Sequence, residues 1–277
     1  MSEAKLILCY NTNGFYHHSL EEATRIIADL GYKGVALTPD VHHLNPLVST
    51  LRDLDTYRTL LEQLGLRVVV ETGARYVMDP MKKHHPSLLT PGRGRERLRF
   101  LKSCVEMAGE LGAPIVSFHS GTAEGVASRE RDLDTLAGFT DELLQICEGR
   151  GLCLALEPEP GMLIEAMADY EALKDRCRNK HLRLTLDTGH VHITENATMS
   201  EVISCFAPDL VNVHLDDAAN GKHEHLPPGT GEILFSPAME ALKEMGRELF
   251  LSVELSRHGH EAVKQAEAAF SFFSSML

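Results

Sequence analysis

The stretch Leu64-Gly65-Leu66-Arg67-Val68-Val69-Val70-Glu71 joins the end of a predicted helix to a predicted strand. Glycine tolerates the left-handed backbone conformation in which helices often end, so Leu64-Gly65 predicts a helix C-terminus. The run Val68-Val69-Val70 has no polar side chain on either face, which is typical of a parallel strand covered by helices on both sides. The strand then ends on a carboxylate. Much of the rest of the chain repeats parts of this order of helix, glycine, buried strand and ionisable residue.

The same unit recurs in both directions along the chain. Glycine endings return at Leu30-Gly31, Leu111-Gly112 and Met245-Gly246, and Ser19-Leu20-Glu21-Glu22 predicts a helix start with a capping box. Eight strands are predicted, at Lys5–Cys9, Gly34–Leu37, Arg67–Glu71, Ile115–His119, Cys153–Glu157, Leu182–Asp187, Leu210–His214 and Phe250–Glu254. Eight strand–helix units in a chain of 277 residues predict a (β/α)8 TIM barrel that forms a single domain over residues 1–277.

A doubly wound open sheet is the alternative fold for alternating strands and helices. That fold favours a GxGxxG motif after the first strand, and none is present here. No linker or shift in composition marks a second domain. The longest stretches predicted to lack both helix and strand are Thr72–Pro91 and Asp216–Ile233. Both follow strands, and loops on that side of a barrel bind substrates.

Composition narrows the kind of protein. Hydrophobic residues make up 43% and charged residues 24% of the chain, the balance of a soluble enzyme. No apolar run reaches the roughly 18 residues that a membrane span needs, and the first residues predict a strand rather than a signal peptide. The six cysteines are scattered without a CxxC pair, which favours reduced thiols in a cytoplasmic protein. A net charge of −13 argues against nucleic acid as a partner.

Ionisable residues end six consecutive predicted strands, from the third to the eighth: Glu71, His119, Glu157, Asp187, His214 and Glu254. In a (β/α)8 barrel the C-terminal strand ends converge on one mouth. Six such groups without partners would be costly to bury, and their like charges would repel each other. A bound cation removes both difficulties. The strand ends therefore predict a site for a divalent metal.

The last four of these strand ends offer three carboxylates and one imidazole. A mostly oxygen-based set of this kind suits Mn²⁺, Mg²⁺, Co²⁺ or Fe²⁺, and Zn²⁺ is compatible with it. Four protein ligands on an octahedral ion leave two positions for neighbouring oxygens of a substrate. That arrangement polarises a carbonyl group and stabilises an enediolate.

Five short motifs carry a resemblance to a known family. They are Leu156-Glu157-Pro158-Glu159-Pro160-Gly161, Leu186-Asp187-Thr188-Gly189-His190, Val213-His214-Leu215-Asp216-Asp217, the stretch His223-Glu224-His225 with its continuation to Ile233, and Ser252-Val253-Glu254-Leu255. In this order the chain resembles the xylose isomerase-like (β/α)8 superfamily over nearly its whole length. That superfamily groups sugar isomerases and epimerases with endonuclease IV.

The resemblance implies roles for particular residues. Glu157, Asp187, His214 and Glu254 would bind one divalent metal, usually Mn²⁺ in such enzymes, and Glu157 and Glu254 would also act as the acid–base pair. His190 matches a position that contacts substrate oxygens. The predicted activity is isomerisation or epimerisation of a small sugar, sugar phosphate or keto-polyol through an enediolate. A dehydratase begins with the same proton abstraction and belongs to the same prediction.

A resemblance to endonuclease IV supports an alternative activity. His119 lies where that family has a zinc ligand on the fourth strand, and His190 and His225 match two ligands of its third zinc. The third-strand histidine is replaced by Glu71, and an aspartate is replaced by His223. Because three imidazoles and a water make an acceptable zinc site, the alternative is a zinc phosphodiesterase or phosphatase with a second or third zinc.

Two further residues are candidates for the mouth of the barrel. Glu159 lies two residues after Glu157, where it would support a ligand or contact a substrate hydroxyl. Arg257 follows the last predicted ligand and offers a bidentate match to an anionic substrate group. The arginine that ketohexose epimerases usually carry after the seventh strand is absent from Asp216–Gly221. A non-catalytic metabolite-binding barrel is the third hypothesis, and the family resemblance implies a homodimer or homotetramer.

Overall fold

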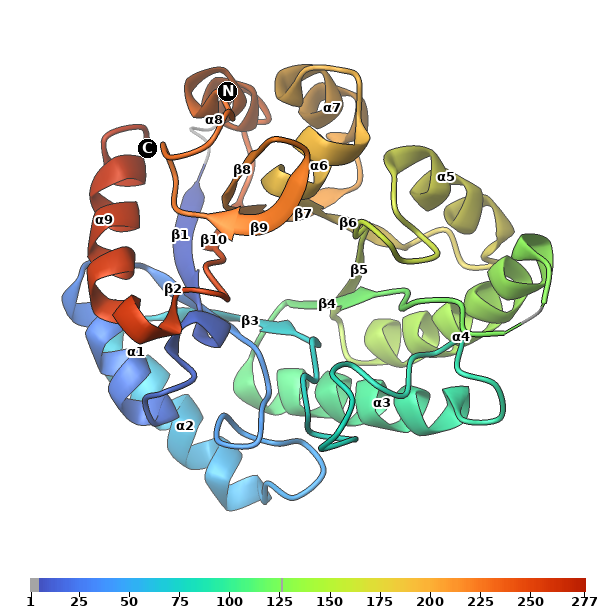
Figure 1. Cartoon of the computed structure of the whole chain (residues 1–277). Helices are drawn as coiled ribbons and strands as arrows, with labels where there is room; N and C mark the ends of the chain where they lie inside the picture. The colour runs from blue at the N-terminus through green and yellow to red at the C-terminus, as the bar shows by residue number, and fades with distance from the viewer. Residues whose placement is uncertain (1–4, 126) are drawn as a thin grey trace. The chain divides into compact units, whose positions relative to one another are not determined.

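The computed structural model describes residues 5–125 and 127–277. In this part of the chain eight parallel strands form a closed barrel in the order β1-β10-β7-β6-β5-β4-β3-β2 (Figure 1). The predicted (β/α)8 fold is therefore confirmed, and the open doubly wound sheet is excluded. The prediction of one domain over residues 1–277 stays a prediction.

The barrel strands are β1 (Leu6–Asn11), β2 (Gly34–Leu37), β3 (Arg67–Glu71), β4 (Ile115–His119), β5 (Cys153–Glu157), β6 (Arg183–Asp187), β7 (Leu210–Leu215) and β10 (Leu249–Val253). The helices are α1 (Leu20–Asp29), α2 (Leu51–Leu64), α3 (Gly94–Leu111), α4 (Arg129–Gly149), α5 (Met167–Arg176), α6 (Thr188–Thr194), α7 (Met199–Phe206), α8 (Phe235–Glu244) and α9 (Ala262–Ser274). Two 3-10 turns, η1 (Thr12–Phe15) and η2 (Gly259–Glu261), follow β1 and precede α9.

The chain divides into two compact parts. The first part comprises residues 5–37, 60–68 and 184–277, and the second comprises residues 38–59 and 69–183. In the first part β1 pairs with β2 and β10, β10 pairs with β7, and β7 pairs with β6, all in parallel. In the second part β4 pairs in parallel with β3 and β5. Parallel register brings the C-terminal residues of neighbouring strands to the same level.

Burial of the strands follows from their composition. Every residue of β2, β4 and β10 is buried, and only the first residue of β3 is exposed. The apolar run Val68-Val69-Val70 of β3 indicated such burial in the sequence, because a strand needs apolar residues on both faces when both are covered. The predicted helix signals are also present: Ser19 and Glu22 form the capping box of α1, and Gly112 ends α3 in the left-handed conformation at φ +70°.

One prediction about secondary structure was wrong. The stretch Asp216–Ile233 was predicted to lack strands, but it contains an antiparallel hairpin of β8 (Asp217–Ala219) and β9 (Lys222–Leu226). The hairpin turns at Asn220 and Gly221, whose φ values are +56° and +64°. Positive φ at both central residues is the mirror-image turn that joins tightly paired strands, and Asn-Gly is its usual sequence.

No helix in the described residues is long and apolar enough to cross a membrane. None of the six cysteines forms a disulfide among the described residues, and four of them are buried. This agrees with the prediction that the chain carries reduced cysteines rather than a disulfide framework. The prediction of a cytoplasmic location is untested.

Candidate metal centre

Three of the predicted metal ligands meet in the first part of the chain. Asp187 ends β6, His214 is the penultimate residue of β7, and Glu254 directly follows β10. His214 Nδ1 lies 2.9 Å from Glu254 Oε2 and 3.9 Å from Asp187 Oδ2. Strand register produces this meeting, because His214 lies opposite Asp187 on β6 and opposite Ser252 on β10. The arrangement gathers two carboxylates and one imidazole at buried strand ends.

The second oxygen of Glu254 is held by a residue that the sequence did not single out. Asn13 Nδ2 donates to Glu254 Oε1 at 2.7 Å, from the 3-10 turn η1 that follows β1. Burial raises the pKa of Glu254. The charge and hydrogen bond of His214 lower it, as do the charge of His225 and the hydrogen bond of Asn13, and together they outweigh burial. The net effect holds the pKa of Glu254 well below its ordinary value. The carboxylate is therefore ionised and fixed at both oxygens.

The β6–α6 turn explains the sequence Leu186-Asp187-Thr188-Gly189-His190. Asp187 caps α6, because its Oδ1 accepts a hydrogen bond of 2.8 Å from the backbone N–H of His190. The same geometry brings His190 Nε2 to 3.8 Å from Asp187 Oδ1. Gly189 is required there, since a Cβ atom would lie 2.7 Å from Asp216 Oδ1. The spacing Asp-x-x-His is thus a helix start that places two ionisable groups side by side.

His190, His223 and His225 form a second group, called here the three-histidine cluster. Nε2 of His223 lies 2.9 Å from Nε2 of His190 and 2.9 Å from Nε2 of His225. Behind the cluster, Asp216 Oδ2 lies 2.6 Å from Nδ1 of His225. Burial and the neighbouring His225 lower the pKa of His223 to about 4, so its imidazole is neutral near pH 7 and offers a lone pair.

The β8–β9 hairpin and the loop after it build this cluster. His225 has a left-handed backbone, with φ at +48°. Asp217 is fully buried and accepts hydrogen bonds from the backbone N–H groups of Gly229, Gly231 and Ile233, at 2.8 to 3.1 Å. Its carboxylate thereby fixes the loop Pro227–Ile233, which the sequence analysis recognised only as a motif. Arg257 donates to the backbone oxygen of His223 at 2.8 Å and so also holds the hairpin.

The other predicted site residues belong to the second part. Glu71 ends β3, His119 ends β4 and Glu157 ends β5, and His119 lies opposite Glu157 in the strand register. The ring of His119 packs edge to face on His84, with centroids 5.4 Å apart. Glu159 begins a tight turn, in which the backbone N–H of Met162 donates to the backbone oxygen of Glu159 at 3.0 Å. The roles predicted for Glu71, His119, Glu157 and Glu159 remain predictions.

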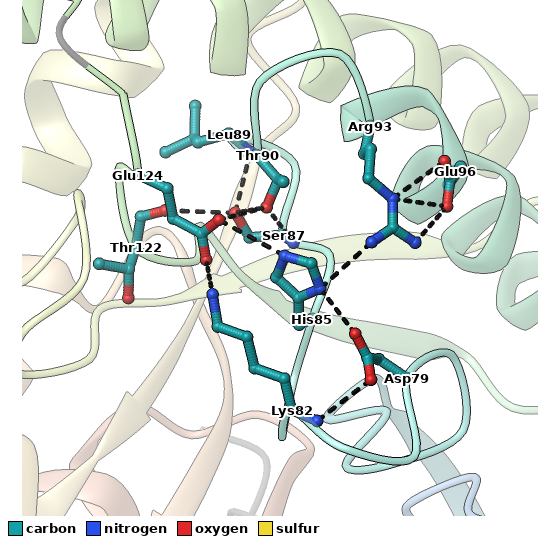
Figure 2. A network of polar contacts seen from close by, with 10 residues as sticks. All are labelled: Asp79, Lys82, His85, Ser87, Leu89, Thr90, Arg93, Glu96, Thr122 and Glu124. Carbon is teal, nitrogen blue, oxygen red and sulfur yellow. Dashed lines mark hydrogen bonds and ion pairs between the residues drawn. The ribbon is translucent and has the colours of Figure 1, made fainter.

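A polar network folds the long loop after β3 within the second part (Figure 2). Glu124 accepts from Lys82 Nζ at 2.7 Å and from Thr90 Oγ1 at 3.2 Å. His85 lies 3.1 Å from Asp79 through Nδ1 and 3.5 Å from Glu124 through Nε2. These contacts give the loop Thr72–Pro91 a defined conformation, although it contains no helix or strand in this structure.

The donor set at Asp187, His214 and Glu254 fits a divalent cation. Two carboxylates and an imidazole converge there, and they are ligand types that Mn²⁺, Co²⁺, Fe²⁺ and Zn²⁺ accept. The three-histidine cluster fits Zn²⁺ better, because it offers only nitrogen ligands and has a carboxylate behind one imidazole. A closed parallel barrel with such groups at its strand ends defines the class of protein: a (β/α)8 barrel with a candidate metal site.

Comparison with known proteins agrees with that class. Residues 24–276 match the family described as xylose isomerase-like TIM barrel, and the chain belongs to this family. An uncharacterized protein of Methanocaldococcus jannaschii is 29% identical over 219 residues, covering 75% of this chain and 74% of the relative.

Solved structures with the same fold include sugar epimerases. A D-tagatose 3-epimerase-like protein has a TM-score of 0.79 at 21% identity, with 98% of each chain covered. D-Allulose 3-epimerase from Methylomonas sp., solved with D-allulose, has a TM-score of 0.77 at 18% identity, with 100% of each chain covered. The IolI protein, solved with a zinc atom, has a TM-score of 0.78 at 18% identity, with 98% of each chain covered. These likenesses establish the shared fold.

Proposed function

We propose that this protein is a divalent-metal-dependent isomerase or epimerase acting on a small sugar, sugar phosphate or keto-polyol. The observation that carries the proposal is the contact of His214 with Glu254 at 2.9 Å and with Asp187 at 3.9 Å. Family membership and the epimerases that share the fold support the same kind of reaction.

Glu157 is proposed as the fourth ligand. It ends β5, which neighbours β6 in the order of the barrel, and β6 ends on Asp187. With Glu157 the set becomes three carboxylates and one imidazole, which leaves positions on an octahedral ion for two substrate oxygens. Mn²⁺, Co²⁺, Fe²⁺ and Mg²⁺ are the proposed metals, and Zn²⁺ also fits.

A divalent metal, when bound, supplies polarisation of the substrate carbonyl and stabilises the negative charge of an enediolate. The chain supplies the proton transfers. Glu254 is ionised, and Asn13 fixes its Oε1, so it is suited to removing a proton from the carbon next to the carbonyl. Glu157 would return a proton to the opposite face of that carbon. Burial of Asp187 and His214 keeps water from competing at the same place.

The test combines metal analysis with a panel of ketoses, their phosphates and keto-polyols. Glu254→Gln removes the base and is expected to lower turnover by about 10²- to 10⁴-fold. Glu248→Gln is the matched control, because Glu248 lies just before β10 and makes surface ion pairs with Lys5 and Arg67. It is expected to keep turnover within about twofold.

Product analysis by NMR separates epimerase, isomerase and dehydratase within this proposal. Full activity in Glu254→Gln would contradict the proposed base. A protein that carries no divalent metal and converts none of these substrates would contradict the whole proposal and favour a non-catalytic barrel.

A second function is favoured by the three-histidine cluster. A zinc phosphodiesterase or phosphatase would use His190, His223 and His225 to hold an additional Zn²⁺, with Asp216 orienting His225. His119 would contribute to a further zinc in that case.

Zinc content decides between the two functions. Two or three zinc ions per chain, one of which is lost in His225→Ala, together with hydrolysis of small phosphate esters, would establish the second function. The exposed His260 provides a control, since His260→Ala removes an imidazole outside the cluster. One metal per chain in the wild type, in His225→Ala and in His260→Ala would exclude this second function.

A further inference from the structure

Three large apolar side chains are exposed at the turn that leads into α2. Leu47, Val48 and Leu51 have exposed fractions of 50%, 73% and 72%, and together they are called here the apolar knob. Leu51 belongs to the apolar stripe of α2, because Leu54 lies one turn further along the helix and is buried. The stripe therefore continues beyond the part of α2 that the chain covers. Exposed apolar groups that gather in this way mark an interaction surface.

Hydrogen bonds fix the backbone on which the apolar knob is carried. The side chain of Asn45 accepts from the backbone N–H of Leu47 at 3.0 Å, and its backbone oxygen accepts from the N–H of Ser49 at 2.9 Å. At the start of α2, the backbone N–H and the hydroxyl of Thr50 both donate to Asp53 at 2.8 Å. The knob is thus ordered before any partner binds, which lowers the entropic cost of binding.

A groove with a volume of about 370 Å³ lies beside the apolar knob. Pro46, Leu51, Leu54 and Met107 form its apolar lining, and further residues of α3 and the residue after α4 complete it. Leu51 belongs both to the knob and to the lining of the groove. A projection and a hollow therefore lie next to each other on one face of the second part.

Charged side chains of both signs surround the groove. Glu106 and Glu110 line it from α3, where they are exposed, lie one turn apart and make no ion pair among the described residues. Two like charges at this spacing repel each other. Arg150 lines the same groove, and Arg52 directly follows the knob. Both guanidinium groups are exposed, and neither makes an ion pair in the part of the chain that the structure describes.

We propose that this face is a two-fold interface between two copies of the chain. An interface of this symmetry uses the same patch on both copies, so the patch must be complementary to itself. Here the knob of each copy enters the groove of the other, and Arg52 of each copy meets Glu106 and Glu110 of the other. An apolar centre with a charged rim is the usual layout of a protein interface.

Self-complementarity is the reason to choose a second copy as the occupant. A different protein partner would require a projection or a hollow, and it would give no reason for both to lie on one face with unpaired charges of both signs. The face lies within the second part and includes none of the candidate metal ligands, so the proposal does not rest on the proposed reaction.

Sedimentation velocity of the full-length protein, at about 1 to 100 μM, measures the dissociation constant of the dimer. The wild type is expected to be dimeric. Val48→Glu should raise the dissociation constant by at least about 100-fold, because the two-fold axis places two new charges in apolar surroundings. Val48 is exposed in the single chain, so the variant should keep the Tm of the wild type at a concentration where both are monomeric.

Val263→Glu is the matched control. Val263 is an exposed valine on α9, in the first part of the chain, and it is not a member of the proposed face. Each copy already has a net charge of −13, so this variant measures what added negative charge alone does to the dimer. Its dissociation constant should stay within about twofold of the wild type.

Charge reversal tests the rim of the interface. Arg52→Glu should weaken the dimer by about 10-fold, because it opposes the carboxylates of the other copy. Adding Glu106→Arg and Glu110→Arg to the same chain should return the dissociation constant to within about threefold of the wild type. Such recovery requires these side chains to meet across the interface.

Three outcomes would overturn the proposal. The first is a wild type that stays monomeric throughout the concentration range, and the second is a dimer that persists unchanged in Val48→Glu. The third is equal dissociation in Val48→Glu and Val263→Glu, which would ascribe the effect to charge alone. If the wild type is monomeric and binds an apolar fluorescent dye that Val48→Glu does not bind, the face serves an occupant other than a second copy, and the proposal is likewise wrong.

Discussion

The two compact parts of the chain treat their buried ionisable groups in opposite ways. In the first part, carboxylates lie directly against imidazoles: Glu254 against His214 at 2.9 Å and Asp216 against His225 at 2.6 Å. In the second part, Arg97 is buried and donates to the backbone oxygen of Thr72 at 2.6 Å, while its Nη1 makes no hydrogen bond among the described residues. At these places the first part sets carboxylates against imidazoles, whereas the second sets a buried guanidinium against a backbone oxygen.

The difference shows that a strand end does not define a site by itself. Glu71 and His119 were predicted by the same reasoning as Asp187 and His214. In the structure the ring of His119 packs on His84, a residue of the long loop after β3. Burial and the charge of Lys83 lower the pKa of His84 to about 3. The neighbours of the strand ends thus differ between the two parts, and the metal-binding roles of all four residues stay predictions.

The largest expected effect is a difference in metal affinity between variants at the strand ends of the two parts. His214→Ala should weaken binding of Mn²⁺ or Co²⁺ by about 100- to 1000-fold, because it removes one of a few ligands and leaves Glu254 without its closest imidazole. Glu71→Gln, at the end of β3, should change the affinity by less than about threefold. Isothermal titration of the apoproteins measures both values. An equal loss in the two variants would mean that Glu71 also serves the metal.

An intermediate effect concerns the pH dependence of stability. The unfolded chain protonates His84 near pH 6.5, whereas the folded chain does so only at about pH 3. Stability that depends on neutral His84 is complete above pH 6.5 and is lost as the pH falls towards 3. His84→Asn should therefore lose about 2 kcal/mol less than the wild type between pH 7.5 and pH 5.

Urea unfolding at the two pH values checks this prediction. Asparagine suits the position because it tolerates the left-handed backbone, and the φ of residue 84 is +59°. The wild type, measured in the same buffers, provides the reference. If His84→Asn has the same pH dependence as the wild type, the loop opens to protonate His84, and burial does not set the pKa of this residue.

The smallest expected effect compares two glycines with left-handed backbone. Gly221 turns the β8–β9 hairpin and Gly112 ends α3, and at neither position would a Cβ atom meet another atom within 4 Å. Each substitution by alanine should cost about 1 kcal/mol of unfolding free energy, a shift in Tm of a few degrees. Only Gly221→Ala should also weaken Zn²⁺ at the three-histidine cluster. Calorimetry measures the loss of stability, and zinc titration measures the affinity. Equal zinc affinity in the two variants would show that the turn at Gly221 does not hold the three-histidine cluster.

Much of the barrel could be predicted because its signals are local. β2, β3, β4 and β5 have the predicted bounds residue for residue, since each is a short run with a polar residue or glycine at its borders. Asp187, His214 and Glu254 were found for a related reason: the C-terminal ends of parallel strands meet wherever a barrel closes. Here the position along a strand was sufficient to predict that the side chains lie together.

The β8–β9 hairpin and the contact of Asn13 with Glu254 had no such local signal in the sequence. The hairpin strand Lys222–Leu226 carries polar side chains on both faces, so it shows no hydrophobic alternation. Asn13 is separated from Glu254 by 241 residues, and their contact follows from the pairing of β1 with β10. Register in three dimensions was needed to find them.

The β8–β9 hairpin has a consequence for how such proteins diversify. In the sheet order of the described residues its two strands pair only with each other, and the eight barrel strands close without it. Two of the three clustered histidines, His223 and His225, come from this short insert. Substitutions in this hairpin can therefore change two of the three imidazoles while the barrel strands and their carboxylates stay the same. The barrel and the β8–β9 hairpin can therefore vary separately.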